Sequence, residues 1–264
     1  MALMSLYKEI ESQEWINIPE GWLQGRTIYG GLVAGILMYK ALMTVNDSAK
    51  KLLSTSITFV GPVQMDKAKL TAEILREGKS VTTIEVRLWQ DDVVQSILIA
   101  SFGLPRQSEI IVQQEREAPI LPKSDTLEIM KFPPFAPQCF QQMDLVWAEG
   151  TYPFTGSDQS DFSGWFRFNE KFHKNRKMNI ADMMIAFDMW PPGILPMLDK
   201  MALASSLTWH VTYIQSLQTS LHDWMKYKVY TDYARDGYST EYAHLWDCND
   251  RLIAISRQTI TIFA

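Results

Sequence analysis

The chain has 264 residues, of which 47% are hydrophobic and 21% are charged, and its formal net charge is −5. This composition excludes an extensively disordered chain, and the length allows one large domain or two of ordinary size. The acidic balance argues against a broad nucleic-acid-binding surface, so no nucleic-acid partner is expected.

The first part of the chain carries no recognisable targeting or membrane-spanning segment. The opening sequence MALMSLYKEIESQ has acidic residues where a secretory signal needs a continuous apolar region. The longest apolar run, near residues 31–42, is interrupted by Lys40 and is shorter than the ~18 residues that a membrane span needs. Cys139 and Cys248 form neither a metal-ligand spacing nor a disulfide framework. We therefore expect no metal, no membrane span and a reducing, cytoplasmic setting.

The first half predicts one helix followed by antiparallel strands. Residues 31–43 form an apolar segment of helical length. Residues 81–88 alternate between apolar and polar side chains, as a strand with one buried face does, and residues 90–92 indicate a hairpin turn. The stretch 105–138 is rich in Pro and charge, which is typical of an exposed linker.

The second half predicts the same order of elements. An apolar segment at 180–199 has helical length, and the prolines Pro191 and Pro192 are expected to kink or shorten it. Residues 241–246 alternate as a strand, and residues 247–250 indicate a turn. Within the predicted helix, Asp188 has apolar neighbours on both sides, although an ionised side chain is rarely buried unless it is paired or used.

The two halves are similar enough to indicate an internal duplication. The segments that begin at Leu75 and Ala234 both read Arg-acid-Gly-x-Ser, then a strand ending in Leu-Trp, a polar turn and a second strand. A repeated Gly-Ile-Leu tripeptide suggests an offset of 158 between the helices, whereas the following strands match at an offset of 150. We adopt the offset of 150, which places Asp188 opposite Met38. The expected fold is α+β, with two helix-wrapped antiparallel sheets: a first repeat at 1–106, a linker at 107–142 and a second repeat at 143–264.

A helix cradled by a long antiparallel sheet, present twice, resembles the double hotdog fold, and the sequence resembles the acyl-CoA thioesterase II (TesB-like) family. The segments that carry the resemblance are GRTIYGGLVAG (25–35), FVGPV (59–63), REGKS (76–80), QSILIASF (95–102), IAFDMWP (185–191), SSLTWHV (205–211), ARDGYS (234–239) and RLIAISRQTI (251–260). The resemblance implies hydrolysis of acyl-CoA to a free acid and CoA, without a cofactor, by a protein that forms a homo-oligomer.

The resemblance also implies three catalytic groups that orient the attacking water: an Asp on the second-half helix, a Thr or Ser on the next strand and a Gln on the last strand. Asp188 and Gln258 fall on the first and third positions. Strict counting puts Ala204 on the second position. Because side chains alternate along a strand, Ser206 and Thr208 are expected on the same face as residue 204, and we select Ser206.

Thioester hydrolysis itself requires a positioned water, a base and donors for the developing oxyanion. A carboxylate in apolar surroundings, such as Asp188, becomes a better base near neutral pH. Backbone amides at a helix start can serve as the oxyanion donors, and the segment Tyr29, Gly30 and Gly31 is the candidate.

Structural roles stay open for the same residues. Asp188 could pair with Arg257 or face solvent, Gln258 could lie on a solvent face, and the glycines could serve only close packing. His210 and His244 are expected to be satisfied core or surface residues. The segment 170–177, EKFHKNRK, reads as a solvated loop that could also meet the phosphates of CoA. The rival function is a catalytically silent acyl-CoA or lipid binder, which Ala204 favours. A dehydratase is disfavoured because no His-containing pair can be located.

Overall fold

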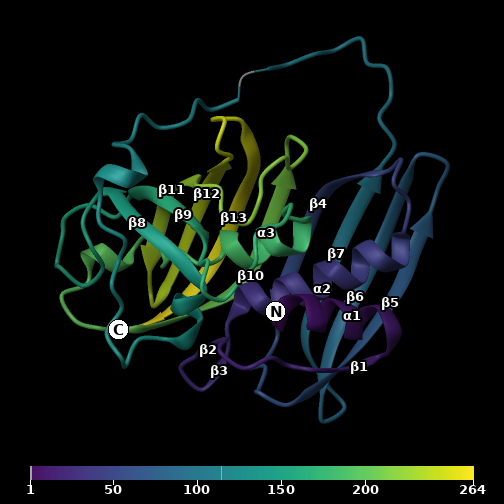
Figure 1. The fold of residues 1–264 in the computed structure, drawn as a ribbon, viewed down its shortest axis with the longest axis horizontal. Helices are drawn as coiled ribbons and strands as arrows, with labels where there is room; N and C mark the ends of the chain where they lie inside the picture. Colours follow the sequence, from purple (N-terminus) through teal and green to yellow (C-terminus); the bar gives the residue numbers. More distant parts are fainter. Residues whose placement is uncertain (1, 114) are drawn as a thin grey trace.

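The computed structural model describes residues 2–113 and 115–264 and shows an α+β protein, as predicted (Figure 1). The α-helices are α1 (Ala2–Ser12), α2 (Gly30–Val45) and α3 (Ile180–Phe187), with short 3-10 helices at Ser124–Thr126, Gln138–Gln142 and Leu195–Met197. The strands are β1 (Trp15–Asn17), β2 (Leu23–Gln24), β3 (Thr27–Ile28), β4 (Lys51–Phe59), β5 (Lys67–Glu77), β6 (Val81–Gln90), β7 (Val93–Gly103), β8 (Met143–Glu149), β9 (Phe162–Phe168), β10 (Leu203–Tyr213), β11 (Met225–Arg235), β12 (Tyr238–Trp246) and β13 (Leu252–Phe263).

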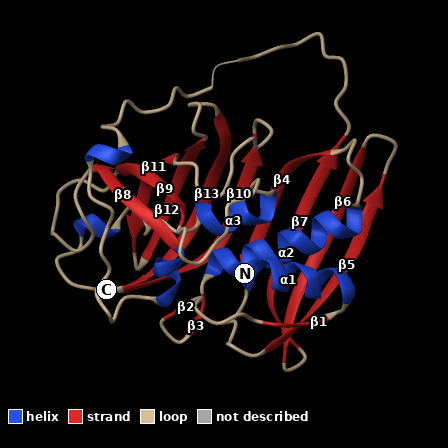
Figure 2. Ribbon diagram, viewed as in Figure 1, coloured by secondary structure: helices blue, strands red, loops and turns tan. Residues whose placement is uncertain are grey.

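Eleven of these strands form one antiparallel sheet, with the order β1-β5-β6-β7-β4-β10-β13-β12-β11-β9-β8. Strands from the first half occupy one side and strands from the second half the other. The two sets join where β4 pairs with β10, for example at Thr58 and Thr208, and we call this pair the seam. Figure 2 shows the three α-helices on the same side of this sheet. The two predicted sheets therefore merge into one continuous surface.

Helix α2 confirms the helix predicted at 31–43 and lies in the centre of the core. Residues 31–38 of this helix are all buried, whichever side of the helix they lie on, as expected for a fully enclosed helix. It crosses α3 closely at Gly35, where an added Cβ atom would lie 2.5 Å from Cγ1 of Ile185. A left-handed residue, Asn46, with φ of 42°, ends the helix.

The helix predicted at 180–199 is too long. Helix α3 ends at Phe187, because Pro191 and Pro192 lack the amide hydrogens that a longer helix would need. Its start at Ile180 lies 150 positions after the start of α2 at Gly30, as the chosen register predicts. Because the helix is shorter than predicted, Asp188 does not lie inside it but caps its carboxyl end.

The linker between the halves is largely exposed and irregular, as expected, and it arches along one edge of the molecule (Figure 1). Its later part is nevertheless tied to the second half. Trp246 Nε1 donates to the Arg116 carbonyl at 3.0 Å, and Lys226 Nζ donates to the Pro119 carbonyl at 3.1 Å. The proposed repeat boundaries stay a prediction.

Helix α1 has no counterpart in the sequence-based prediction. Its apolar stripe of Leu3, Leu6 and Ile10 is buried, and the helix packs against α2. In the part of the chain that the structure describes, none of the helices combines the length and hydropathy needed to cross a membrane.

Candidate active site

Helix α3 begins with a reciprocal cap that fixes its direction. The Asn179 side chain accepts from the Asp182 amide at 2.8 Å, and the Asp182 carboxylate accepts from the Asn179 amide at 2.9 Å. This arrangement satisfies two of the free amides at the start of the helix. Because the helix has only eight residues, its start also determines where Asp188 lies at its end.

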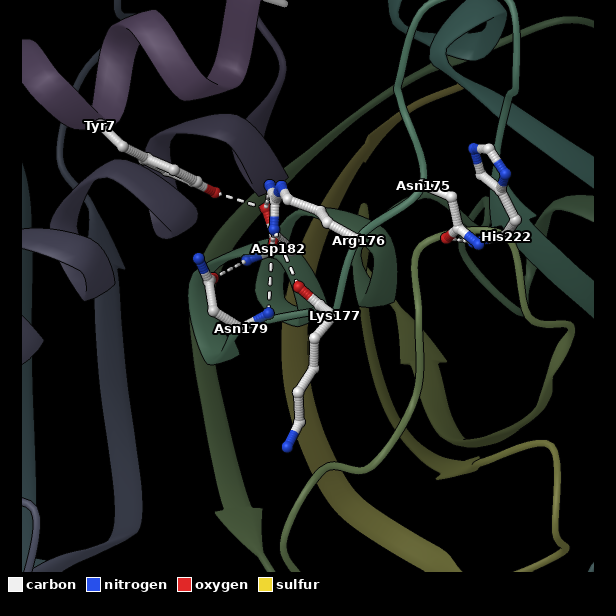
Figure 3. A network of polar contacts seen from close by, with 7 residues as sticks. All are labelled: Tyr7, Asn175, Arg176, Lys177, Asn179, Asp182 and His222. Atoms are coloured by element: carbon white, nitrogen blue, oxygen red, sulfur yellow. Dashed lines mark hydrogen bonds and ion pairs between the residues drawn. The ribbon is translucent and has the colours of Figure 1, made fainter.

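The same carboxylate is the centre of a larger polar network (Figure 3). Asp182 is fully buried and accepts hydrogen bonds on both of its oxygens from the Arg176 guanidinium, one of them at 2.8 Å. The Tyr7 hydroxyl, from helix α1, donates to it at 2.7 Å. Arg176 lies in the segment 170–177, so the interpretation of that whole segment as a solvated loop is wrong at this residue.

One of the three side chains selected as catalytic candidates, Gln258, contacts both of the others. Gln258 Nε2, on β13, donates to Asp188 Oδ1 at 3.2 Å and to Ser206 Oγ, on β10, at 2.6 Å. All three residues are half-buried. The amide therefore uses its hydrogens to hold a carboxylate and a hydroxyl side by side.

A β-bulge explains why Ser206 reaches Gln258. The register between β10 and β13 shifts between Ser206 and Thr208: Ser206 pairs with Ile260, whereas Trp209 pairs with Gln258. Directly paired residues share a sheet face, so Ser206 and Trp209 face Gln258 while Thr208 lies on the opposite face. The expectation that Thr208 shares the face of Ser206 is therefore wrong.

The start of α2 approaches the same carboxyl from the first half of the chain. An added Cβ atom on Gly30 would lie 3.0 Å from Asp188 Oδ2, and the Gly31 amide hydrogen-bonds to the carboxyl. The amino end of a helix favours negative charge, so this position stabilises an ionised Asp188. Residues from both halves thus meet around the Asp188 carboxyl.

Tyr29 braces the two helices. Its buried hydroxyl donates to the Ile185 carbonyl at 2.7 Å, which satisfies a free carbonyl in the last turn of α3. Its ring folds back so tightly that an added Cβ atom on Gly31 would lie 2.4 Å from the Tyr29 hydroxyl. These contacts account for a glycine at position 31 on packing grounds. The oxyanion role of the segment stays a prediction.

The surroundings of Asp188 make it a stronger base than an exposed aspartate. Burial of its carboxyl raises its pKa to about 7, and the hydrogen bonds from Gln258 and the Gly31 amide oppose part of that rise. The alternative pairing with Arg257 is wrong, because Arg257 pairs with Asp232 at 2.8 Å. Asp188 instead has its negative charge balanced by hydrogen-bond donors.

Other candidate groups offer less chemistry. Cys139 is buried, and burial followed by the nearby charge of Asp188 raises the pKa of its thiol to about 12, which disfavours a thiolate. His210 is exposed and contacts Ser56, whereas His244 is buried and its Nδ1 has no partner among the described residues, so only the first is satisfied as expected. Over residues 2–113 and 115–264, no three His, Cys, Asp or Glu side chains are grouped as metal ligands.

Glu241 is a neighbour of this site that the sequence analysis missed. It lies on β12 directly opposite Gln258 and is buried, with 3% of its surface exposed. The signal was present in the sequence, because the alternation of β12 puts position 241 on the buried face with Ser239 and Ala243. An acid at a buried position of a strand raises the same question as Asp188.

Known protein-family models match both halves of the chain. A family model described as the acyl-CoA thioesterase N-terminal domain matches residues 18–103, and one described as the acyl-CoA thioesterase C-terminal domain matches residues 117–262. No curated protein matches the sequence. The two family models thus cover almost the whole chain in the order that the duplication predicts.

Solved structures share the fold at low sequence identity. A conserved hot dog protein of unknown function from Alicyclobacillus acidocaldarius has a TM-score of 0.83 at 18% identity and covers 95% of this chain and 92% of its own. The acyl-CoA thioesterase II TesB2 from Mycobacterium marinum has a TM-score of 0.75 at 17% identity and covers 98% of both chains. The tesB protein of Mycobacterium avium subspecies paratuberculosis has 0.75 at 12%, covering 99% and 100%. At such identities the likeness shows the fold, a double hotdog.

Proposed function

Because this chain belongs to the acyl-CoA thioesterase family, we propose that it hydrolyses the thioester bond of acyl-CoA, with Asp188 as the base for water. The observation that carries the proposal is the shared contact of Gln258 Nε2 with Asp188 and Ser206. A carboxylate and a hydroxyl held by one amide can bind a water molecule between them, one accepting its proton and the other positioning its oxygen.

The proposed reaction needs no covalent intermediate with the protein. The water oxygen attacks the thioester carbonyl carbon while Asp188 accepts a proton from the water. The carbonyl oxygen becomes an oxyanion, which the amino end of α2 stabilises. The Gly30 amide is the donor we favour, since the first amides of a helix have no partner within it. Collapse of the intermediate breaks the C–S bond, and the CoA thiolate takes up the proton from Asp188.

Release of CoA from a panel of acyl-CoAs, followed with a thiol reagent, tests this proposal. We expect release that depends on the protein and saturates with substrate. The rival function, a silent binder, rested on Ala204 at the hydroxyl position, and Ser206 supplies a hydroxyl there instead. Tight acyl-CoA binding with no release of CoA would support that rival and contradict hydrolysis.

The rate is expected to depend on pH because the proposed base must be ionised. With the pKa of Asp188 raised to about 7, kcat/KM should fall tenfold per pH unit below that value and level off above it. The measurement is kcat/KM between about pH 5 and 9, a range that contains the expected transition. A profile that stays flat through neutrality would contradict the role of Asp188.

Gln258 provides a second check of the same profile. Its amide stabilises the ionised carboxyl, so the Gln258→Leu variant should move the rising limb to higher pH as well as lower the maximal rate. A variant that loses activity without moving the limb would indicate that Gln258 acts on the substrate rather than through Asp188.

A further inference from the structure

Four side chains form a row across the face of the sheet that bears the site. Trp209 on β10 pairs with Gln258 on β13, Gln258 pairs with Glu241 on β12, and Glu241 pairs with Thr231 on β11. Paired side chains share a face and lie about one strand spacing, ~4.8 Å, apart. Glu241 is therefore the immediate lateral neighbour of the amide that holds Asp188.

Glu241 lacks the partners that a buried carboxylate needs. Its one hydrogen bond comes from the Gly193 amide, at 2.7 Å, and within the described residues no cation pairs with it. Burial, and then the nearby charges of Asp188 and Asp161, raise its pKa to about 8, although the Gly193 amide opposes that rise. The raised pKa favours the protonated form of Glu241 at neutral pH, and in that form it can donate a hydrogen bond. Asp188 is the more readily ionised acid of the two.

The row also contains polar atoms that no protein group satisfies. Trp209 Nε1 and Thr231 Oγ1 are both buried and, among the described residues, neither has a hydrogen-bond partner. Each such group destabilises the folded state unless a water or a ligand satisfies it. Trp209 flanks Gln258 on one side, and Glu241 with Thr231 flanks it on the other. Unsatisfied hydrogen-bonding capacity therefore lies on both sides of the proposed reaction centre.

Building on the proposed function, we propose that Glu241 determines specificity by donating a hydrogen bond to the acyl group, so that the enzyme prefers acyl groups with a hydroxyl or similar polar substituent. The position of that substituent follows from the sheet geometry. One strand spacing from Gln258, ~4.8 Å, corresponds to three or four bonds along an extended acyl chain from the carbonyl carbon. A hydroxyl on the third carbon, whose oxygen is three bonds from the carbonyl carbon, is therefore the preferred substituent. An unsubstituted chain would leave the buried acid without its partner, which disfavours that substrate.

A purely structural role for Glu241 makes a different prediction. Its contact with Gly193 fixes the turn after Pro191 and Pro192, which begins five residues after Asp188. If this were its whole contribution, a change at Glu241 would misplace Asp188 and lower the rate equally for all acyl groups. The ratio of two rates therefore separates specificity from structure, whereas a single rate does not.

The test compares hexanoyl-CoA with each enantiomer of 3-hydroxyhexanoyl-CoA in the full-length protein. We expect kcat/KM to favour one hydroxylated enantiomer about tenfold, the effect of one net hydrogen bond. Glu241→Gln keeps an acceptor for the Gly193 amide and a donor for the substrate, so it should keep most of the preference. Glu241→Met has a similar size but no donor, and its ratio should fall to within about twofold of unity.

Each outcome decides the matter. Equal rates on both substrates in the wild-type protein, or a preference that Glu241→Met leaves unchanged, would overturn the role of Glu241 while the thioesterase function stands. Loss of the preference in both variants would assign it to the carboxyl group itself and still support Glu241. If the wild-type protein released CoA from none of the substrates, the proposed function would fall, and this inference with it.

Discussion

The Asp188→Asn variant is expected to release CoA at least ~10²-fold more slowly than the wild-type protein, the usual contribution of a general base. Asn has nearly the same shape as Asp, and its carbonyl oxygen can still accept from Gln258 Nε2, a contact of 3.2 Å in the wild-type protein. The variant should therefore keep the site and lose only the basic oxygen. The measurement is kcat at saturating acyl-CoA, at a pH above the pKa of Asp188.

A matched control changes a second aspartate in the region 180–199. Asp199 is exposed and has no place in the proposed mechanism, so Asp199→Asn should leave kcat unchanged. The melting temperature of Asp188→Asn should not fall, because the change removes a charge that burial disfavours, as the raised pKa of Asp188 shows. Equal kcat values for Asp188→Asn and the wild-type protein would refute the assignment of the base.

Removal of the Arg176 guanidinium is expected to lower the free energy of unfolding more than the other substitutions proposed for this protein. In the Arg176→Leu variant the buried carboxylate of Asp182 loses the cation that contacts both of its oxygens. An uncompensated buried charge costs ~3–5 kcal/mol, and we expect about 3 because the Tyr7 hydroxyl and the Asn179 amide still donate to it. The measurement is the free energy of unfolding from urea titration.

The chain offers a second Arg–Asp pair as the control for this experiment. Arg257 and Asp232 are 2.8 Å apart, but their side chains remain 58% and 38% exposed. Solvent screens such a pair, so Arg257→Leu should cost only ~0–1 kcal/mol. If Arg176→Leu were no more destabilising than Arg257→Leu, Asp182 would not depend on its cation, and the network of Figure 3 would be dispensable.

Features that depend on the local pattern of apolar and polar residues could be predicted from the sequence. The apolar length of α2 and the repeated strand-turn-strand motif predicted two helix-wrapped halves, and these are present. The offset of 150 placed Asp188 within the second helix, opposite Met38, and the resemblance to a known family added Gln258. The structure brings these two side chains together.

Features that depend on irregular or distant contacts were not accessible. Alternation alone could not reveal that the register shifts after Ser206, so Thr208 was placed on the wrong face. The network around Asp182 joins Tyr7 to a residue 175 positions away, and no local pattern encodes such a contact. Glu241 was overlooked because an acid in an alternating strand reads as solvent-facing unless the buried parity is checked.

The pairing of β4 with β10 constrains how this molecule can move. A substrate cannot enter by the two halves swinging apart, since that motion would break main-chain hydrogen bonds along a shared strand boundary. Gly31, whose amide hydrogen-bonds to Asp188, belongs to the first half, so separation would also remove a donor from the proposed base. Fragments made by dividing the gene would each present an unpaired strand edge, prone to pair with other chains. Separation of the two halves of the sheet and loss of thioesterase activity should therefore occur together.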